Sequence, residues 1–345
     1  MEAGRKAGSN IVNTPANEAA RDELARKIIA NCDQCRLETL VDKYGAEMHR
    51  IHVRRKYFID VTVDPWVVEV KTSPLTSLQF KNESGFIQKV VFDSAKEIGI
   101  KPSELAGGGH IHFDLERAFK GDVKHFRNFL VDSAHNSFLH RGVFGNDSSN
   151  APTFAEMNRR QRSAFKKLIA EIDANPKKFT INKITKRMTE EVYYRNPRNW
   201  SPPEKYQNIN LTRVPLKEDA TVEIRGLNAQ KSMEHFVMLT EMFERRIESL
   251  KGLPPIPLDF KLVDDGDLIT RLWIYSHEVG IEFEKMKSFT IPFLQQFKPD
   301  GAKVEAYLRA KYPEEVALQM IDNFHNNVPV KKFTDRCLDF VRAIL

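Results

Sequence analysis

The chain has 345 residues, of which 41% are hydrophobic and 29% are charged, and this is enough apolar material for one large domain or two smaller ones. This composition excludes a short linear peptide and a wholly disordered tail. The 53 basic and 47 acidic residues leave a net charge of +6, which is compatible with an anionic ligand. Strong nucleic-acid binders usually concentrate far more charge on one face, so composition alone leaves nucleic-acid binding open, although nucleic acid is not the expected partner.

Targeting signals and cysteines together indicate a cytoplasmic protein. The sequence contains no apolar run of the roughly 20 residues that a membrane span requires, so no membrane partner is expected. The first six residues are polar and lack the apolar core of a secretion signal. Three cysteines, Cys32, Cys35 and Cys337, are too few for a disulfide framework and fit a reducing compartment.

Cys32 and Cys35 form a single Cys-x-x-Cys pair. A structural zinc site needs four ligands, and His49 and His52 are the candidates that would complete one. Because no second Cys-x-x-Cys pair is present, two reduced thiols at the end of a helix are the favoured interpretation.

The order of predicted elements indicates an α+β fold. Helical spacing of apolar residues predicts helices, whereas alternating or β-branched runs bounded by turn residues predict strands. The expected elements are a flexible arm over 1–16, a helix over 17–31, strands between 35 and 72, a helix over 84–98, a strand after the glycines at 107–109, mostly helical chain over 115–199, strands over 205–226, a helix over 230–249 and helices to the end. The last helix carries Phe333, Phe340 and Ile344 on one apolar face.

These elements predict an antiparallel sheet with helices on one side. The expected domains are the arm over 1–16, a sheet-containing domain over 17–252 with a helical insertion at about 115–205, and a helical C-terminal region over 253–345. The boundary near 252 follows from Gly252 and the proline cluster after it.

Polar side chains recur in pairs on the predicted strands. Side chains at positions i and i+2 of a strand point to the same face. The pairs are Glu69 with Lys71, His110 with His112, Asn208 with Asn210, and Glu223 with Arg225. A solvated sheet face typically carries Thr, Ser, Lys and Gln instead. Carboxylate, imidazole and guanidinium groups can bind Mg²⁺ or Mn²⁺ and phosphate, so a functional face is the favoured interpretation.

Three segments that carry these pairs resemble motifs of one enzyme family. The segment 66–75 reads WVVEVKTSPL and resembles the Glu-x-x-(Thr/Ser)-x-Pro-Leu strand of the amidoligases. The segment 108–112 reads GGHIH and resembles the Gly-x-His-x-His strand of the glutamine-synthetase-like carboxylate–amine ligases. The segment 221–226 reads TVEIRG and resembles their Glu-Phe-Arg-type strand. The three occur in the family's order and span about residues 35–250.

The resemblance implies a glutamine-synthetase-like α+β fold, in which the antiparallel sheet curves around an active-site funnel. It also implies an ATP- and Mg²⁺-dependent (or Mn²⁺-dependent) ligase that joins a small-molecule or peptide carboxylate to an amine through an acyl phosphate. It implies that Glu69, His110 and Glu223 are metal ligands, and that His112 lies near the nucleotide phosphates together with Lys71. It also implies that Arg225 neutralises the phosphoryl group during transfer. Metal ions and Arg are suited to offset the charge that develops in such a reaction.

The opening Gly-x-Glu-x-Glu strand of the family has only an approximate counterpart. The segment 45–49 reads GAEMH, so Glu47 is the candidate for a further metal ligand and His49 stands where a second Glu is expected. Glu47 is only 22 positions before Glu69. This departure leaves open a non-catalytic binding protein of the same fold.

A metal-dependent nuclease is the main alternative. Asp60 or Asp64, followed by Glu69 and Lys71, fits an Asp…Glu-x-Lys pattern, in which two carboxylates hold Mg²⁺ and the Lys steadies the attacking water. This alternative gives no role to the His110/His112 pair or to the Glu223/Arg225 pair.

Overall fold

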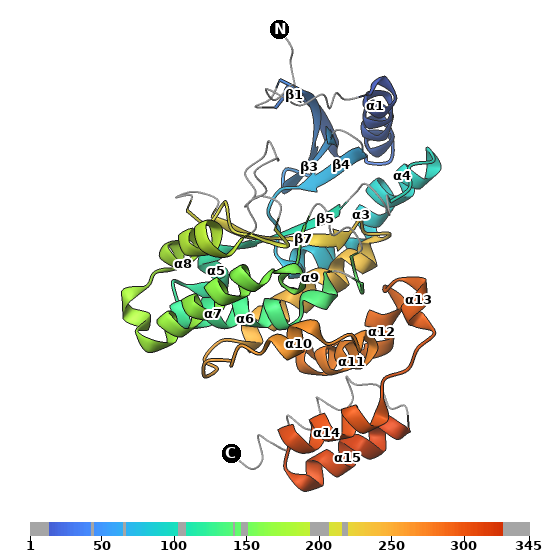
Figure 1. Cartoon of the computed structure of the whole chain (residues 1–345). Helices are drawn as coiled ribbons and strands as arrows, with labels where there is room; N and C mark the ends of the chain where they lie inside the picture. Colours follow the sequence, from blue (N-terminus) through green and yellow to red (C-terminus); the bar gives the residue numbers. More distant parts are fainter. Residues whose placement is uncertain are drawn as a thin grey trace. The chain divides into compact units, whose positions relative to one another are not determined.

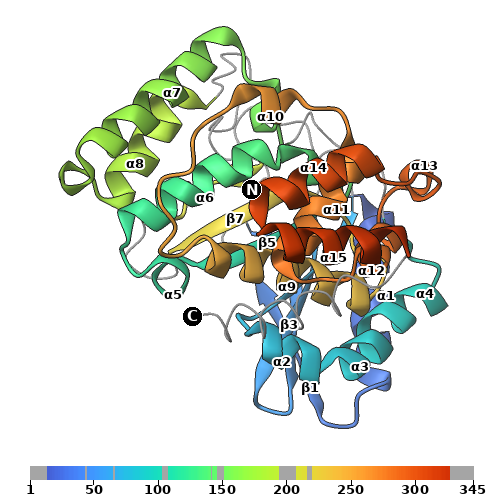
Figure 2. The same ribbon diagram turned by 90° about the horizontal axis from the view of Figure 1, so that it is seen from below.

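The fold is described from a computed structural model of the chain. The structure describes residues 14–42, 45–64, 67–102, 108–140, 142–145, 151–193, 207–215 and 220–326. The chain divides into two compact units. The first unit contains the described residues up to Gly109 and Asn228–Glu241, and the second contains the described residues of His110–Arg195, Pro203–Leu227 and Met242–Leu345. Figures 1 and 2 show both units in two views.

The first unit is built on a four-stranded antiparallel sheet in the order β1-β2-β3-β4. Its strands are β1 (Cys35–Val41), β2 (Glu47–Val53), β3 (Tyr57–Asp64) and β4 (Val67–Thr72). Each strand pairs with the next one along the chain, with Ile51 opposite Ile59 and Asp60 opposite Lys71. The strands expected between 35 and 72 are therefore confirmed. Trp66 lies outside the described residues.

Helices cover the apolar face of this sheet. Helix α1 (Pro15–Ala30) begins with Thr14, whose hydroxyl accepts a hydrogen bond from the Asn17 amide at 3.2 Å, and with a proline in its first turn. In Figure 1, α1 lies alongside the blue strands of the sheet. The expected arm over 1–16 therefore ends before Pro15, and residues 1–13 lie outside the described ranges. Leu24 and Ile28 of α1 are buried in one core with Ile59 of β3.

The helix expected over 84–98 is present as contiguous helical segments over 84–97, but they are of mixed type. The helical elements of this region are α2 (Ser77–Asn82), α3 (Ser84–Ile87), a π-helical segment (Gln88–Asp93) and α4 (Ser94–Glu97). Val90 and Val91 of the π-helical segment are buried in the same core as Phe80. Ring contact between Phe80 and Phe236 of α9 (Met233–Ser249) adds a further element to this core.

The second unit contains a three-stranded sheet in the order β5-β7-β6. Its strands are β5 (Gly108–Asp114), β6 (Ile209–Asn210) and β7 (Thr221–Asn228). The sequence predicted one sheet, and the structure corrects this expectation: β4 ends its own sheet, and β5 pairs with β7 instead. The α+β class is confirmed. Alternation within a strand does not specify the partner strand, because pairing depends on backbone hydrogen bonds between distant segments.

Helices make up most of the second unit. Between β5 and β6 the structure has α5 (Leu115–Phe119), α6 (Val123–His135), α7 (Arg159–Ala174), α8 (Ile181–Arg187) and a π-helical segment (Met188–Val192). After α9 it has α10 (Phe260–Asp264), α11 (Leu268–Val279), α12 (Phe283–Ser288), α13 (Pro292–Gln295), α14 (Gly301–Lys311) and α15 (Glu314–His325). Figures 1 and 2 both show α14 and α15 side by side. The mostly helical C-terminal region is thus confirmed.

Two further sequence expectations concern the C-terminal half. The expected boundary at 252 falls inside the second unit, which continues from Met242 through α15. The apolar stripe with Phe333 and Ile344 lies outside the described residues. Among the described residues, no helix combines the length and the apolar character that crossing a membrane would require.

Candidate active site

Four of the predicted site residues come together on the three-stranded sheet. His110 and His112 lie on β5, and Glu223 and Arg225 lie on β7, the neighbouring strand. Their side chains converge on one oxygen, Oε1 of Glu223. Arg225 Nη1 is 2.7 Å from it, His110 Nδ1 is 3.3 Å away and His112 Nε2 is 3.6 Å away. The two pairs therefore share a face, as alternation along each strand predicts.

The Glu223 carboxylate is buried and held in a fixed orientation. Only 6% of its side chain is exposed, against 25% for His110 and 36% for His112. Asn210, its register partner on β6, donates a hydrogen bond from Nδ2 to Oε2 at 2.5 Å. Asn210 Oδ1 in turn accepts hydrogen bonds from the amide and hydroxyl of Thr212 at 2.9 and 2.8 Å. Oε2 is thus anchored, and Oε1 faces the three nitrogen groups.

His112 has a second contact that sets the orientation of its ring. Its Nδ1 lies 3.1 Å from Oγ1 of Thr221, the first residue of β7. This contact directs Nε2 towards Glu223. The sequence motifs assign no role to Thr221, and Asn210 has none in them beyond its pairing with Asn208. The two-residue spacing of Asn208 and Asn210 was the available signal for Asn210, but only the β6–β7 register places it opposite Glu223.

Asn208 departs from the expected pairing with Asn210. A Cβ atom on Gly226 would lie 2.7 Å from Asn208 Oδ1 and 2.9 Å from Cβ of His140. Gly226 alternates with Arg225 along β7, so this contact is on the reverse face of the strand. Asn208 and His140 therefore support β7 from behind. Burial lowers the pKa of His140 to about 3, which keeps its ring neutral beneath the sheet.

Glu69 and Lys71 lie in the first unit, on β4, and form an ion pair at 2.6 Å. They share a face of β4, as predicted, and Lys71 is opposite Asp60 of β3. The structure therefore places the predicted residues in two groups, one in each unit. Their assembly into a single site remains a prediction.

The carboxylates of the alternative nuclease set are also on the first sheet. Asp60 is buried, and its two oxygens accept hydrogen bonds from Nε and Nη2 of Arg50 at 2.8 and 2.9 Å. Asp64 is exposed at the end of β3. A guanidinium fork thus contacts both oxygens of Asp60.

Glu47 lies in a cluster with Asp22 and His49, also in the first unit. One ligand atom from each of the three lies within 4.8 Å of the others, and within the described ranges this is the one group of at least three His, Cys, Asp or Glu residues with that spacing. His49 Nε2 is 2.8 Å from Asp22 Oδ1. Asp22 comes from α1, so no local sequence pattern links it to β2.

A buried arginine already supplies positive charge to this cluster. Arg21 Nη2 lies 2.6 Å from Asp22 Oδ1 and 3.0 Å from Glu47 Oε1, and only 5% of the Arg21 side chain is exposed. Burial alone would raise the pKa of Asp22, but hydrogen bonds to His49 and Arg21 lower it below the ordinary value. The predicted metal ligand Glu47 is therefore an ion-pair partner of Arg21 in this structure.

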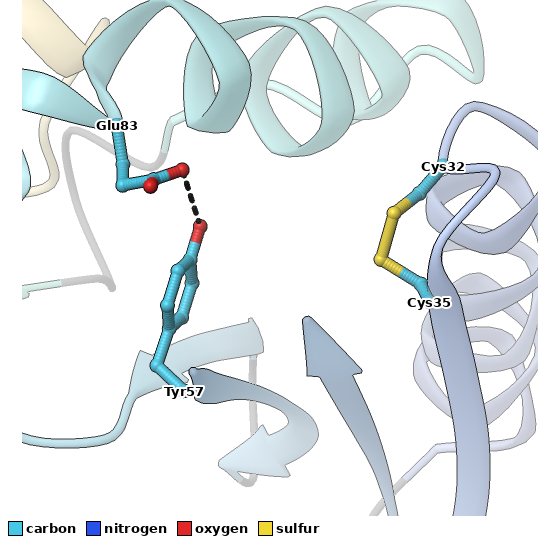
Figure 3. The surroundings of a disulfide bond; sticks show 4 residues. All are labelled: Cys32, Cys35, Tyr57 and Glu83. Carbon is cyan, nitrogen blue, oxygen red and sulfur yellow. Dashed lines mark hydrogen bonds between the residues drawn. A yellow bond between two sulfur atoms is a disulfide. The ribbon is translucent and has the colours of Figure 1, made fainter. Parts of the chain in front are cut away.

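The structure corrects the expectation for the Cys-x-x-Cys pair. Cys32 and Cys35 are joined by a disulfide between the end of α1 and the start of β1 (Figure 3). His49 and His52, the candidates for completing a zinc site, contact Asp22 and Glu38 instead, at 2.8 and 2.7 Å. A Cys-x-x-Cys spacing is compatible with reduced thiols and with a bond, and only the approach of the two sulfur atoms distinguishes them.

Comparisons of the chain with protein-family models, with curated proteins and with solved structures found no match. Function must therefore be inferred from the chemistry of the Glu223 cluster and its neighbours. The Glu223 cluster offers a carboxylate oxygen, two imidazole nitrogens and a guanidinium on one sheet face. This donor set is suited to a divalent cation and to phosphate oxygens.

Proposed function

We propose that the protein is an ATP-dependent carboxylate–amine ligase that requires Mg²⁺ or Mn²⁺, as the resemblance to the amidoligases implies. The single observation that supports this most is the convergence of His110, His112 and Arg225 on Glu223 Oε1. The proposal extends to a glutamine-synthetase-like funnel and to a cytoplasmic location. Its substrates would be a small-molecule or peptide carboxylate and an amine.

The donor chemistry of the cluster fits a divalent cation. Carboxylate oxygen suits Mg²⁺ and Mn²⁺, and imidazole nitrogen suits transition-metal ions. Glu223 and His110 would hold the cation, with Glu69 and Glu47 as the further ligands that the resemblance implies. When bound, the cation would offset negative charge on the ATP phosphates.

The remaining residues would act on the phosphates. Arg225 carries a planar guanidinium with five N–H donors, so it can retain Glu223 while it donates to a phosphoryl oxygen. His112, oriented by Thr221, would lie near the phosphates, and Lys71 would add a further positive charge there. The side chains of Arg225, His112 and Lys71 can all donate hydrogen bonds to phosphate oxygens.

The proposed reaction has two steps. An oxygen of the substrate carboxylate attacks the γ-phosphorus of ATP, and the bond to ADP breaks, giving an acyl phosphate and ADP. The amine nitrogen then attacks the carbonyl carbon, phosphate leaves, and the nitrogen loses a proton. Arg225 would stabilise the phosphoryl group in the first step and the departing phosphate in the second.

The test is a thermal-shift titration with ATP, with and without Mg²⁺ or Mn²⁺. A ligand at about 100 times its dissociation constant stabilises a protein by about 2.7 kcal/mol, which gives a measurable shift. We expect a metal-dependent shift in the wild type and its loss in Glu223→Gln. The matched control is Glu248→Gln, which removes an acid whose side chain is 71% exposed, and it should behave as the wild type.

A shift that is absent, or that Glu223→Gln retains, would contradict the ligase proposal. Cleavage of nucleic acid without ATP, lost in Lys71→Ala, would instead establish the nuclease alternative. A protein that neither binds ATP nor cleaves nucleic acid would fit the non-catalytic alternative. Circular dichroism of each variant shows whether its fold is retained.

A further inference from the structure

The turn between β2 and β3 has an unusual composition. Its central residues, Arg54 and Arg55, have φ angles of 48° and 57°, and the Lys56 amide donates a hydrogen bond to the Val53 carbonyl at 2.8 Å. Turns with two positive φ angles strongly favour Asn-Gly, because most side chains are strained there. Two arginines therefore occupy positions where the positive φ angles favour Asn and Gly. Strain of this kind is frequently found where the side chains serve a function.

A pocket of about 780 Å³ opens beside this turn, within the first unit. Its lining includes four cationic side chains, Arg36, Arg54, Arg55 and Lys56, together with His52 and Cys35. None of the described residues that line it is an Asp or a Glu. The volume lies in the range of small-molecule sites. We name this feature the turn pocket.

The positive charge of the turn pocket is only partly balanced by its neighbours. Glu38 lies 2.7 Å from His52 and 3.7 Å from Arg36, and Glu83 lies 3.8 Å from Lys56. In the part of the chain that the structure describes, no carboxylate forms an ion pair with Arg54 or Arg55. The pocket therefore has an excess of positive charge at the turn.

The turn is also held in place from both sides. The Arg54 amide donates a hydrogen bond at 3.1 Å to the carbonyl of Gln34, inside the four-residue disulfide loop. The Arg54 guanidinium lies over the Phe86 ring, with its carbon 4.6 Å from the ring centre. A cation held by its backbone and its side chain loses less conformational freedom when it binds a ligand.

We propose that the turn pocket binds a ligand that carries two or more phosphate groups, at a site separate from the proposed ATP site. Arginine recognises phosphate through paired N–H donors, and Arg54 and Arg55 bring two such groups to adjacent positions. Single-stranded nucleic acid fits less well, because its bases stack on open aromatic rings. Here Arg50 covers the Phe58 ring at 3.8 Å, and Tyr57 is buried with its hydroxyl on Glu83 at 3.5 Å (Figure 3).

The test is calorimetric titration of the full chain with inorganic tripolyphosphate, in EDTA so that no metal-dependent ATP site contributes. The informative variant is Arg54→Asn/Arg55→Gly, which removes two charges and installs the residues that the turn prefers, so it should fold normally. The matched control is Lys177→Gln/Lys178→Gln, which removes two exposed charges elsewhere. We expect the turn variant to bind at least about tenfold more weakly, and the control within about twofold of the wild type.

Several outcomes would overturn the proposal. These are no binding of tripolyphosphate by the wild type, equal weakening in both variants, binding of inorganic phosphate as tight as that of tripolyphosphate, or tighter binding of a single-stranded oligonucleotide. Phosphatidylcholine vesicles with and without a bisphosphorylated inositol lipid identify the source of the phosphates. Sedimentation with the phosphorylated vesicles would assign a lipid headgroup, and binding of tripolyphosphate alone would assign a soluble ligand. Glu223→Gln should leave this binding unchanged, which separates it from the ligase proposal.

Discussion

The four-stranded and three-stranded sheets both carry ionisable side chains on one face, but they distribute them differently. On the first sheet Asp60 pairs with Arg50 and Glu69 pairs with Lys71. On the second sheet three nitrogen-bearing side chains surround one carboxylate, Glu223. In each one-to-one pair both partners are used, whereas the Glu223 cluster also holds two imidazoles, whose N–H groups can donate hydrogen bonds to an added anion. This difference is the reason for centring the proposed ATP site on the face of the second sheet.

The largest expected effect on stability comes from removing the shared carboxylate. Glu223→Ala should lower the free energy of unfolding by about 3–5 kcal/mol, because Arg225 and the amide of Asn210 then face a buried gap. Glu69→Ala, on the partly exposed pair, should cost less than about 1 kcal/mol. Urea denaturation of both variants measures the two losses. Equal losses of unfolding free energy would show that the Glu223 cluster is no more important for stability than the Glu69–Lys71 pair.

A smaller loss is expected from the Arg50 pair of the first sheet. Arg50→Met keeps an apolar stem over Phe58 but leaves Asp60 buried without its guanidinium partner, so it should cost about 2 kcal/mol. The loss should be smaller than for Glu223, because 29% of the Arg50 side chain is exposed. Arg50→Met/Asp60→Leu should recover most of it, as measured by a double-mutant cycle. Failure to recover would assign the loss to packing rather than charge.

The smallest effect is expected at Asp22, and it depends on pH. The lowered pKa of this carboxyl means that ionised Asp22 stabilises the folded state above its unfolded pKa of about 3.9, and that this contribution is lost as the pH falls through the folded pKa. The difference in stability between wild type and Asp22→Asn should therefore be constant near neutral pH and shrink below about pH 4. Urea denaturation across this range, with Glu23→Gln as a control on the same helix, measures it.

The same cluster allows a second check on the first sheet. If Arg21 rather than a metal ion supplies the positive charge of the Asp22, Glu47 and His49 cluster, EDTA should leave the urea midpoint of the wild type unchanged. A lower midpoint in EDTA, absent in Asp22→Asn, would show that Asp22, Glu47 and His49 hold a metal ion instead. That result would show that the first sheet also holds a cation with its carboxylates, as is proposed for the second sheet.

Most of the local structure could be predicted from the sequence. The strands that carry Glu69, His110 and Glu223 follow from β-branched and alternating runs, and the long helix α9 follows from its apolar spacing. The i, i+2 rule also placed His110 with His112, and Glu223 with Arg225, on common strand faces. These properties depend only on residues near one another in the chain.

Tertiary structure alone decided which strands pair and which side chains meet. The division into two sheets depends on pairing between distant strands. The contacts of Asn210 with Glu223 and of Arg21 with Glu47 likewise join segments distant in the sequence. Likewise, a Cys-x-x-Cys spacing does not fix the disulfide of Cys32, and a run of basic residues does not reveal a pocket beside Arg54. The sequence determined the elements and their polar faces because these are local. Pairing and burial required the folded chain, because they depend on hydrogen bonds and packing between distant segments.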